Sequence, residues 1–319
     1  MTATSGQGAF KFSVRQDLSV LPKRALPYET HLHGGFAIDA RTGRGEIYYG
    51  MPGCGIVKVS ADLTEQEVLR TDNRFDKINF HSTKIFSFEG KESLYLASDS
   101  DEKVVILSLD GELKEVFTRP AFAEYRKDTA AFHPTDTVLW HDQLFIADGY
   151  GSNYVTAIDV NKKQWKKIFG GKSDSLEDGK FTTAHGMGLH PLNQHLSICD
   201  RPNGVIKIHN IEGDYIDVFR LPQGAYLCGI NYFKKQSRWY AVIGCLQDPD
   251  IKKGRSAPIY IVDAESFELL SIIRPKDELG VEHAVHIHNV VMHIHNDRLY
   301  LVCQSWNPGH YFVLQHDIG

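Results

Sequence analysis

The stretch Ala184-His-Gly-Met-Gly-Leu189, Leu196-Ser-Ile-Cys-Asp200, Val205-Ile-Lys-Ile-His209 and Tyr215-Ile-Asp-Val-Phe-Arg220 reads as four short strands in succession. Each run is rich in apolar, β-branched or aromatic residues, and Gly, Asp, Asn or Pro separates it from the next. This alternation is typical of antiparallel strands joined by tight turns. Helical periodicity is almost absent from the rest of the chain. The sequence therefore predicts an all-β fold.

The same four-strand unit recurs with a period of about 50 residues, which is typical of a propeller or a similar array. The second strand of the unit recurs at 46–50, 94–98, 144–148, 196–200, 239–243 and 299–303, and the third at 55–59, 104–108, 155–159, 205–209, 259–263 and 311–315. No linker interrupts the six units. We interpret the chain as one domain over residues 1–319, a six-bladed β-propeller, with longer loops near 119–130 and 246–257.

The closure of the ring is expected to involve the N-terminus. The sixth unit ends at Gly319 without a fourth strand of its own, whereas a spare strand, Ala9-Phe-Lys-Phe-Ser-Val14, precedes the first unit. A closed ring leaves no bare sheet edge. We therefore expect the N-terminal strand to complete the last blade, and residues 1–8 to form a flexible tail.

Composition narrows the classes of partner. The 319-residue chain has a formal net charge of -5 with dispersed charges and no basic block, which argues against nucleic acid. No apolar run approaches the roughly 18 residues of a membrane span, and the N-terminus has no apolar signal region. The five cysteines are odd in number and lack CxxC spacing, which argues against disulfides and a thiolate zinc site. We expect a cytoplasmic protein with a small-molecule substrate.

The first strand of each blade lines the channel of a propeller, so equivalent positions on these strands meet around one axis. His81, His185 and His288 occupy this position in units two, four and six, separated by 104 and 103 residues. Three converging imidazoles form a facial ligand set for a divalent metal and leave a position open for water or substrate. Such a metal lowers the pKa of bound water to about 7 or polarises a substrate oxygen. The alternative is three unrelated histidines that pack in strands or cap turns.

Two further histidines are candidate ligands. His286 precedes His288 by two residues, and the strand period of two places both on one face, so His286 could replace His288 or join it. His33 occupies the equivalent region of the first unit. Zinc is the metal expected for three histidines, whereas a fourth would favour iron or manganese.

The second strands end in loops over one mouth of the channel, where polar residues gather. Asp148-Gly-Tyr150 lies there in unit three and Asp200-Arg201 in unit four. A tyrosine near a metal can act as acid or base, and an arginine can hold a carboxylate bidentately. We predict Tyr150 and Arg201 as catalytic residues, and Arg201, Asp136 and Asp148 as substrate-binding residues. The alternative is structural, because Asp-Gly is a common turn and aspartates cap loops.

Four segments resemble peptidyl-α-hydroxyglycine α-amidating lyase: Pro134-Thr-Asp-Thr137, Phe145-Ile-Ala-Asp-Gly-Tyr-Gly-Ser-Asn153, Ala184-His-Gly-Met-Gly-Leu189 and Cys199-Asp-Arg-Pro-Asn-Gly204. That family is a six-bladed, NHL-like propeller that releases a peptide amide and glyoxylate from a hydroxyglycine terminus. The likeness is strongest over residues 130–210. It implies that His81, His185 and His288 bind zinc, that Tyr150 is the catalytic tyrosine and that Arg201 is an active-site arginine.

Departures from the family pattern argue against peptide amidation itself. The family's other arginine follows the second strand of blade one, where this chain has Tyr49-Gly-Met51. Asn289 replaces an aspartate tied to a structural calcium, so calcium is not expected. Gly151 replaces a disulfide cysteine of this secretory family. The resemblance therefore implies for this chain the propeller scaffold, the metal site and the tyrosine–arginine pair, but not the family's reaction.

The leading hypothesis is a metal-dependent lyase that acts on a small oxygen-bearing substrate, such as a hemiaminal or an α-hydroxy compound. Alternatives are a lactonase-type hydrolase, whose family relatives use carboxylate and amide ligands for calcium, and a histidine-ligated non-haem iron oxygenase. A further alternative is a non-catalytic NHL-type propeller that binds proteins through a broad exposed face.

Overall fold

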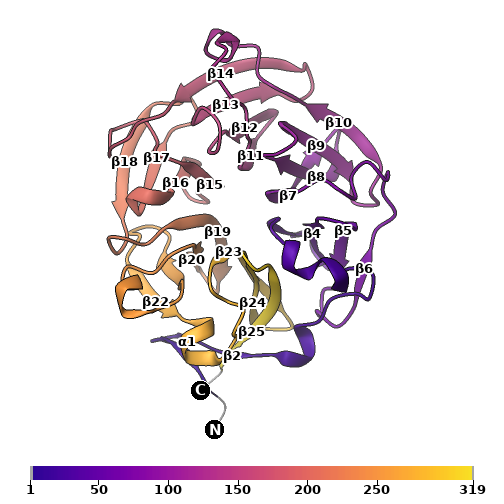
Figure 1. The fold of residues 1–319 in the computed structure, drawn as a ribbon, viewed down its shortest axis with the longest axis vertical. Coiled ribbons are helices and arrows are strands. Elements are labelled where there is room, and N and C mark those ends of the chain that lie inside the picture. Colours follow the sequence, from indigo (N-terminus) through magenta and orange to yellow (C-terminus); the bar gives the residue numbers. More distant parts are fainter. Residues whose placement is uncertain (1–2, 318–319) are drawn as a thin grey trace.

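Six antiparallel sheets form a ring around a central channel (Figure 1). The structure is a computed structural model that describes residues 3–317. In five of the sheets the chain starts at an inner strand beside the channel and proceeds outward, whereas the sixth sheet takes its two outermost strands from the N-terminus. The inner strands of neighbouring blades contact one another around the ring. The predicted all-β, six-bladed propeller is confirmed.

The strands follow the predicted repeat. Blade one contains β3 (Phe36–Ile38), β4 (Ile47–Met51), β5 (Gly55–Val59) and β6 (Gln66–Val68), and blade two contains β7 (Ser82–Phe88), β8 (Lys91–Ser98), β9 (Lys103–Ser108) and β10 (Leu113–Phe117). Blade three contains β11 (Asp136–Trp140), β12 (Gln143–Ala147), β13 (Tyr154–Asp159) and β14 (Gln164–Gly170), and blade four contains β15 (Ala184–Leu189), β16 (Leu196–Asp200), β17 (Val205–His209) and β18 (Tyr215–Arg220).

Blade five contains β19 (Leu227–Lys235), β20 (Arg238–Cys245), β21 (Ile259–Asp263) and β22 (Leu269–Ile273), and blade six contains β23 (Ile287–His295), β24 (Arg298–Ser305) and β25 (His310–His316), joined by β2 (Phe10–Val14) and β1 (Ser5–Gln7). The described helices are short: η1 (Gln16–Leu18), η2 (Leu26–His31), η3 (Ala123–Arg126), η4 (Arg201–Asn203), η5 (Ile251–Lys253) and α1 (Pro275–Leu279). None of the helices in the described part of the chain has the length and apolar character needed to cross a membrane.

The apolar core lies between the faces of neighbouring blades. Tyr49 of blade one stacks on Tyr311 of blade six with ring centroids 5.9 Å apart, and Phe36 packs edge-on against both rings. Strands in the middle of a blade are covered on both faces, so β17 is buried at every residue, whereas the outer strand β18 is not. The apolar faces of each blade are therefore covered by the two neighbouring blades. A closed ring is needed so that no blade is left with an uncovered apolar face.

The N-terminal strand closes the ring as predicted. β2 pairs with β25 in an antiparallel register that sets Phe12 opposite His316 and Val14 opposite Leu314. Both ends of the described chain consequently lie beside the same blade (Figure 1).

The flexible tail expected over residues 1–8 is not what the structure shows for Ser5–Gln7. These residues form β1, antiparallel to β2, and cover the edge that β2 would otherwise leave bare. The Ser5 hydroxyl donates to Glu278 at 2.6 Å, and the Gln7 backbone N–H donates to the Ser271 hydroxyl at 2.9 Å. Residues 1–2 of the expected tail lie outside the described residues.

Closure by β2 yields a stability prediction. The Phe12 side chain is fully buried, so Phe12→Ala is expected to lower the free energy of unfolding by about 3–5 kcal/mol, from lost transfer energy and a cavity. The neighbouring Lys11 is exposed on the same strand, so Lys11→Ala should stay within about 0.5 kcal/mol of wild type. Chemical denaturation of both variants checks this, and equal effects of the two changes would show that β2 is not part of the blade.

Candidate active site

Irregular starts of the inner strands direct side chains into the channel. The pairing of β23 with β24 skips His288, the pairing of β19 with β20 skips Cys228, and the pairing of β15 with β16 skips His185 and Gly186. Such bulges turn the extra residue out of the regular pleat. Gly186 is required at its position because a Cβ there would collide with the Cys228 carbonyl oxygen. His81 lies directly before β7, in the corresponding place.

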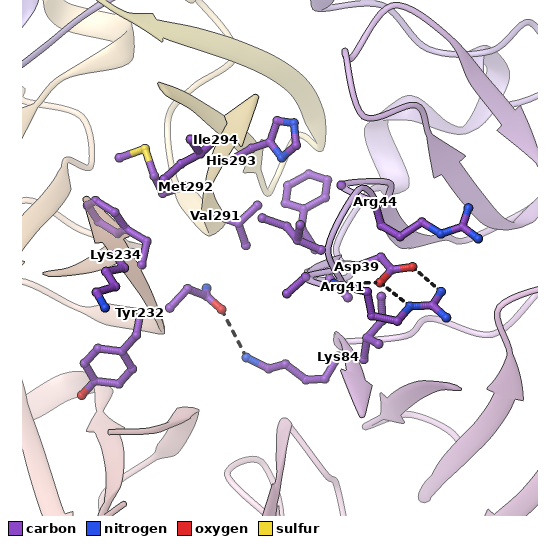
Figure 2. Close-up of a pocket in the computed structure, with 18 of the residues that line it drawn as sticks. Asp39, Arg41, Arg44, Lys84, Tyr232, Lys234, Val291, Met292, His293 and Ile294 are labelled. Carbon is purple, nitrogen blue, oxygen red and sulfur yellow. Dashed lines mark hydrogen bonds and ion pairs between the residues drawn. The ribbon is translucent and has the colours of Figure 1, made fainter. Parts of the chain in front are cut away.

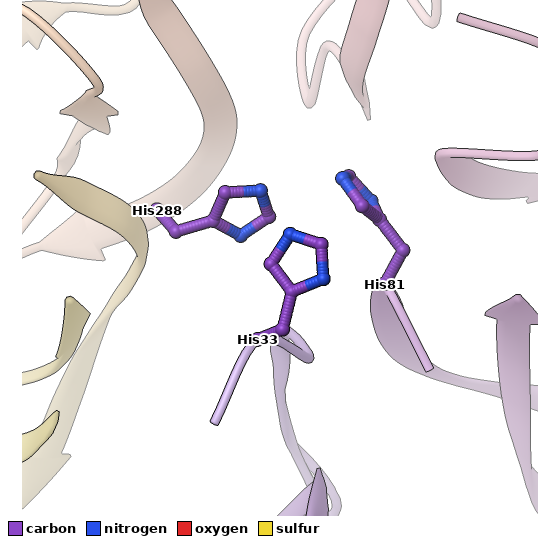
Figure 3. Close-up of side chains that lie close together, drawn as sticks. All are labelled: His33, His81 and His288. Atoms are coloured by element: carbon purple, nitrogen blue, oxygen red, sulfur yellow. The ribbon is translucent and has the colours of Figure 1, made fainter. Parts of the chain in front are cut away.

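Four buried histidines surround the channel axis. The ring centroid of His81 lies 4.6 Å from that of His185 and 4.7 Å from that of His288. His33 joins them, with its centroid 4.3 Å from that of His288. The three histidines with ligand atoms all within 4.8 Å of one another are His33, His81 and His288 (Figure 3). The structure thus brings the three predicted histidines together with His33, the candidate fourth ligand.

Two of these histidines have the tautomer of a metal ligand. Nδ1 of His81 lies 2.6 Å from the Thr135 carbonyl oxygen, and Nδ1 of His185 lies 2.7 Å from the Cys228 carbonyl oxygen. A carbonyl oxygen only accepts, so each Nδ1 carries the proton and each Nε2 offers a lone pair. Metal-binding histidines are commonly oriented by such a bond from the other ring nitrogen.

His288 combines unpartnered ring nitrogens with a place among other histidines, whereas His209, whose ring nitrogens are also unpartnered, packs between two phenylalanine rings. Both ring nitrogens of His288 are buried and have no hydrogen-bond partner among the described residues. An unsatisfied buried polar group costs about 1–3 kcal/mol. Burial, and next the neighbouring His33 and His81, hold the pKa of His288 well below its usual value, so the ring is neutral. Buried neutral imidazoles with free nitrogens fit a divalent transition metal.

His33 can present a nitrogen to the same point. Its Nδ1 lies 2.9 Å from Nδ2 of Asn79, and the Asn79 Oδ1 has no partner. A half turn of the Asn79 amide places Oδ1 against a protonated Nδ1 and leaves Nε2 of His33 with a lone pair. Burial lowers the pKa of His33 to about 4, so this ring is also neutral.

His286 is not part of the histidine group. Its Nδ1 contacts the Leu246 carbonyl oxygen. The expectation that it shares a face with His288 assumed regular alternation along the strand. The bulge at His288 breaks that alternation, and β23 begins only at Ile287.

Arg201 and Tyr150 meet at His185. The Tyr150 hydroxyl lies 2.9 Å from Nε2 of His185, and Nη1 of Arg201 donates to the Tyr150 oxygen at 2.9 Å. Nη2 of Arg201 also contacts Nε2 of His185 and lies 3.5 Å from the Cys228 sulfur. The lone pair of His185 is thus already engaged, unlike those of His288.

The guanidinium of Arg201 has no anionic partner among the described residues. The residue is 8% exposed, its Nε has no hydrogen-bond partner, and its other contacts go to Tyr150, His185 and Cys228. A buried charge without a counter-ion is costly, so an anionic ligand group would be bound strongly here. The carboxylate-holding role of Arg201 stays a prediction.

Tyr150 carries its proton at neutral pH. Burial raises the pKa of its hydroxyl above the usual value, although Arg201 acts in the opposite direction. The residue is 38% exposed, and its hydroxyl points inward, 3.3 Å from Nε2 of His81. It is therefore placed to exchange a proton between the histidine group and the mouth of the channel.

Asp148 does not face the channel, which corrects its predicted role in substrate binding. Its carboxylate accepts hydrogen bonds from the backbone N–H of His133 at 2.6 Å and of Ser152 at 2.8 Å, and from the Tyr125 hydroxyl at 2.8 Å. Asp148 is fully buried. These bonds hold the loop that carries Tyr150, as the structural alternative proposed.

Asp136 lies in the channel but on the far side of the histidines from Tyr150. It lines a narrow section with His81, His185 and His288, and its Oδ2 accepts from the Met187 N–H at 2.8 Å. The same oxygen is 3.4 Å from Nζ of Lys84. Asp136 therefore forms an ion pair with Lys84 and does not lie beside Arg201, where the substrate-binding role was predicted.

Asp148 gives a pH-dependent prediction. Burial raises its pKa from an ordinary value of 3.8 to about 6. The pKa of Asp148 is higher in the folded than in the unfolded protein, so ionisation of this carboxyl costs more in the folded state. The protein therefore has its full stability from the protonated carboxyl below about pH 4 and loses it as the pH rises through about 6. The wild type should therefore lose up to about 3 kcal/mol relative to Asp148→Asn between pH 4 and pH 7.

Chemical denaturation at several pH values measures this difference. The exposed turn residue Asp110 provides a control, because Asp110→Asn should follow the wild type at every pH. A pH-independent difference between wild type and Asp148→Asn would contradict the prediction.

Three contacts of channel residues were not predicted. Trp306 is 36% exposed, and its ring centroid lies 5.5 Å from that of His33. It directly follows β24, the second strand of blade six, so the rule that selected Tyr150 and Arg201 would also have found it. Lys84 pairs with Asp136, and the Cys228 thiol contacts Arg201; no motif marks either contact.

The Arg201 loop is held by a buried ion pair. Asp200 accepts hydrogen bonds from the backbone N–H groups of Thr182 and Thr183, each at 3.0 Å, and lies 3.2 Å from Nζ of Lys207. Both charged residues of this pair are buried. Arg201 follows Asp200 directly, so its position over the channel is determined by this network.

Comparison with known proteins shows the fold. No family model and no curated protein matches the sequence. A gluconolactonase from Xanthomonas campestris matches with a TM-score of 0.60 and 11% identity, covering 98% of this chain and 99% of that one. A catalytically inactive virginiamycin B lyase from Staphylococcus aureus, solved with quinupristin, matches with a TM-score of 0.53 and 9% identity, covering 86% of this chain and 78% of that one. At such identities the similarity shows a shared propeller fold, and the resemblance to the amidating lyase stays a prediction.

Proposed function

We propose that this protein is a metal-dependent lyase for a small substrate in which one carbon carries a hydroxyl group, a carboxylate and a leaving nitrogen or oxygen, such as a hemiaminal of an α-keto or aldehyde acid. The observation that carries the proposal is His288, whose two buried nitrogens lack partners in the middle of a group of neutral histidines. Beside this group lies Arg201, a buried cation without a carboxylate partner among residues 3–317.

The metal would be held by His33, His81 and His288, with His185 as a fourth ligand once Arg201 releases its Nε2. Four histidines favour iron or manganese over the zinc expected for three. When bound, the metal would supply Lewis acidity, which favours ionisation of a hydroxyl or polarises a carbonyl.

The other residues of the site bind substrate and move the proton. Arg201 would hold the substrate carboxylate through two N–H donors. Tyr150, protonated at neutral pH, would give its proton to the leaving nitrogen or oxygen and take the proton of the substrate hydroxyl as the carbon–heteroatom bond breaks. An aldehyde or keto acid and a protonated leaving group would result. Trp306 would form a wall of the mouth opposite Tyr150.

The two similar structures support an enzyme rather than a protein-binding propeller, because one is described as a lyase and the other as a gluconolactonase. A lactonase-type hydrolase is the second candidate, since the gluconolactonase aligns over nearly the whole chain. The fourth histidine also keeps the iron oxygenase as an alternative. We further propose a cytoplasmic protein without nucleic-acid or membrane partners; its five free, buried cysteines suit a reducing compartment.

Elemental analysis of untagged protein, followed by a substrate screen, tests the proposal. About one transition-metal ion per chain is expected, together with turnover of carboxylated hemiaminals or hemiacetals that a chelator abolishes and that needs no oxygen. Lactone hydrolysis would favour the second candidate, and oxygen-dependent turnover would favour the oxygenase. A metal-free protein without any such turnover would contradict all three and favour the protein-binding propeller.

A further inference from the structure

The end of the channel opposite Tyr150 and Arg201 opens into a cavity of about 640 Å³ that the proposed reaction does not use (Figure 2). We call it the lysine pocket. Its walls are the later parts of the inner strands of blades one, two, five and six, including Lys84 of β7, Lys234 of β19 and Met292 of β23. Its volume lies in the range of about 300–1,000 Å³ that is usual for small-molecule sites.

The lysine pocket is separate from the histidine group. Between them lies the narrow section lined by His81, Asp136, His288 and their neighbours, where the cavity measures only about 10 Å³. That volume accommodates about one water molecule. The lysine pocket is thus described by its own lining, which contains none of His33, His81, His185 and His288.

The charge of the lysine pocket contrasts with that of the whole chain. Its lining contains four cationic side chains, Arg41, Arg44, Lys84 and Lys234, and one acidic side chain, Asp39. The chain as a whole has a formal net charge of -5. Asp39 is bound by Arg41 at 2.6 Å. Two acidic side chains just outside the lining lie near other cations, Glu46 at 3.5 Å from Arg44 and Asp136 at 3.4 Å from Lys84, whereas Lys234 has no acidic partner among the described residues. A concave site with charge of one sign concentrates ligands of the opposite sign.

Lys84 is the least exposed of the four cations that line the lysine pocket. Its side chain is 15% exposed and extends from β7 toward the opposite strand β19 (Figure 2). Nζ lies 3.4 Å from Oδ1 of Asn231 and 3.4 Å from Oδ2 of Asp136, both longer than an ordinary N–H···O bond. An ammonium group has three donors, so Lys84 retains capacity for an anion that enters the pocket.

The remainder of the lining is apolar and aromatic. It comprises side chains such as Phe86, Tyr232, Trp239 and Met292, which come from three different blades. Lys234 lies over the ring of Trp239, with Nζ 5.8 Å from its centroid, so a rim cation borders an aromatic surface. A ligand that fits must combine an anionic group with a flat or apolar body.

We propose that the lysine pocket binds a small amphipathic organic anion, whose carboxylate, sulfonate or phosphate pairs with Lys84 while its apolar part lies on the aromatic wall. Arg44 and Lys234 draw the anion to the mouth of the pocket. This binding is independent of the metal and of Arg201.

The probe for this proposal is 1-anilinonaphthalene-8-sulfonate, an aromatic anion whose fluorescence rises in apolar surroundings, titrated into the folded full-length chain. One saturable site is expected, and the uncharged analogue N-phenyl-1-naphthylamine should bind at least about tenfold more weakly. Arg44→Ala combined with Lys234→Ala leaves the Lys84–Asp136 pair in place and should raise Kd by about tenfold. Lys84→Met should raise it further, and Lys84→Arg should restore most of the affinity.

Two controls separate the lysine pocket from the rest of the surface. Lys166→Ala removes an exposed cation from the outer strand β14 and should leave Kd unchanged. Arg201→Met should also leave it unchanged, whatever becomes of the proposed lyase activity. Lack of saturable binding, equal affinity for the neutral analogue, wild-type affinity in the double variant or loss of binding in Arg201→Met would each overturn the proposal.

Discussion

The metal-free His288→Leu variant is expected to be more stable than metal-free wild type by about 1–3 kcal/mol, and to be no longer stabilised by metal. In the wild type both ring nitrogens of His288 are buried without hydrogen-bond partners. The folded protein is therefore destabilised by the free energy of removing these nitrogens from water. An apolar side chain at the same place removes that cost. The wild type, in contrast, gains about 4 kcal/mol when free metal is a thousandfold above Kd.

The two stability curves should therefore cross as metal is added. Thermal and chemical unfolding with and without zinc, iron(II) or manganese measures this, and metal content is determined in parallel. His209→Leu is a matched control, because His209 is a buried histidine of β17 that packs between Phe169 and Phe181, away from the channel. Its metal response should equal that of the wild type. A full metal response in His288→Leu would show that His288 is not a ligand.

Arg201→Met is expected to lower kcat/KM for a carboxylate substrate by about 10²–10³-fold. Losses of this size are usual when a buried hydrogen-bond donor that stabilises a negative charge is removed. Arg201→Lys should recover little, since a single ammonium does not reproduce the two parallel donors of guanidinium. For amide or ester analogues of the substrate, which lack the negative charge, Arg201→Met should lower kcat/KM much less than for the acid.

A second readout distinguishes this role from a general loss of structure. Burial and next Arg201 lower the pKa of His185, so removal of the guanidinium should raise that pKa in an NMR titration of the histidines. Arg298, exposed on β24, offers the control Arg298→Met, which should change neither quantity. An equal fall in kcat/KM for charged and uncharged substrates, together with an unchanged pKa of His185, would show that Arg201 does not bind the carboxylate.

The blades and the four channel histidines, with His33 as a candidate fourth ligand, could be predicted because their signals are local. Strands such as β5, β17 and β21 coincide with the predicted ranges, since a strand covered on both faces is a continuous apolar run between turn residues. The repeat length then assigns His81, His185 and His288 to equivalent places. No pairing between distant residues is needed for either inference.

His33 and the aspartates illustrate where local patterns leave the role of a residue open or assign it wrongly. His33 lies between η2 and β3, outside any strand, so the register that located the other histidines does not apply to it. Asp148 was assigned to substrate, but Tyr125 and His133 bind it from a preceding loop. Nothing in the spacing of these residues shows that their donors converge on one carboxylate.

The amino-acid sequence alone therefore determined the number of blades, the closure by the N-terminal strand and the positions on which the channel side chains stand. These follow from the alternation of apolar runs and turns and from a constant repeat. Only the tertiary structure decided which of those side chains still need a partner. His288 is unsatisfied, His185 is already bound by Arg201 and Tyr150, and Lys84 reaches across to Asn231. Hydrogen bonding and burial depend on what the neighbouring blades place around each group, and a repeat pattern carries no record of that.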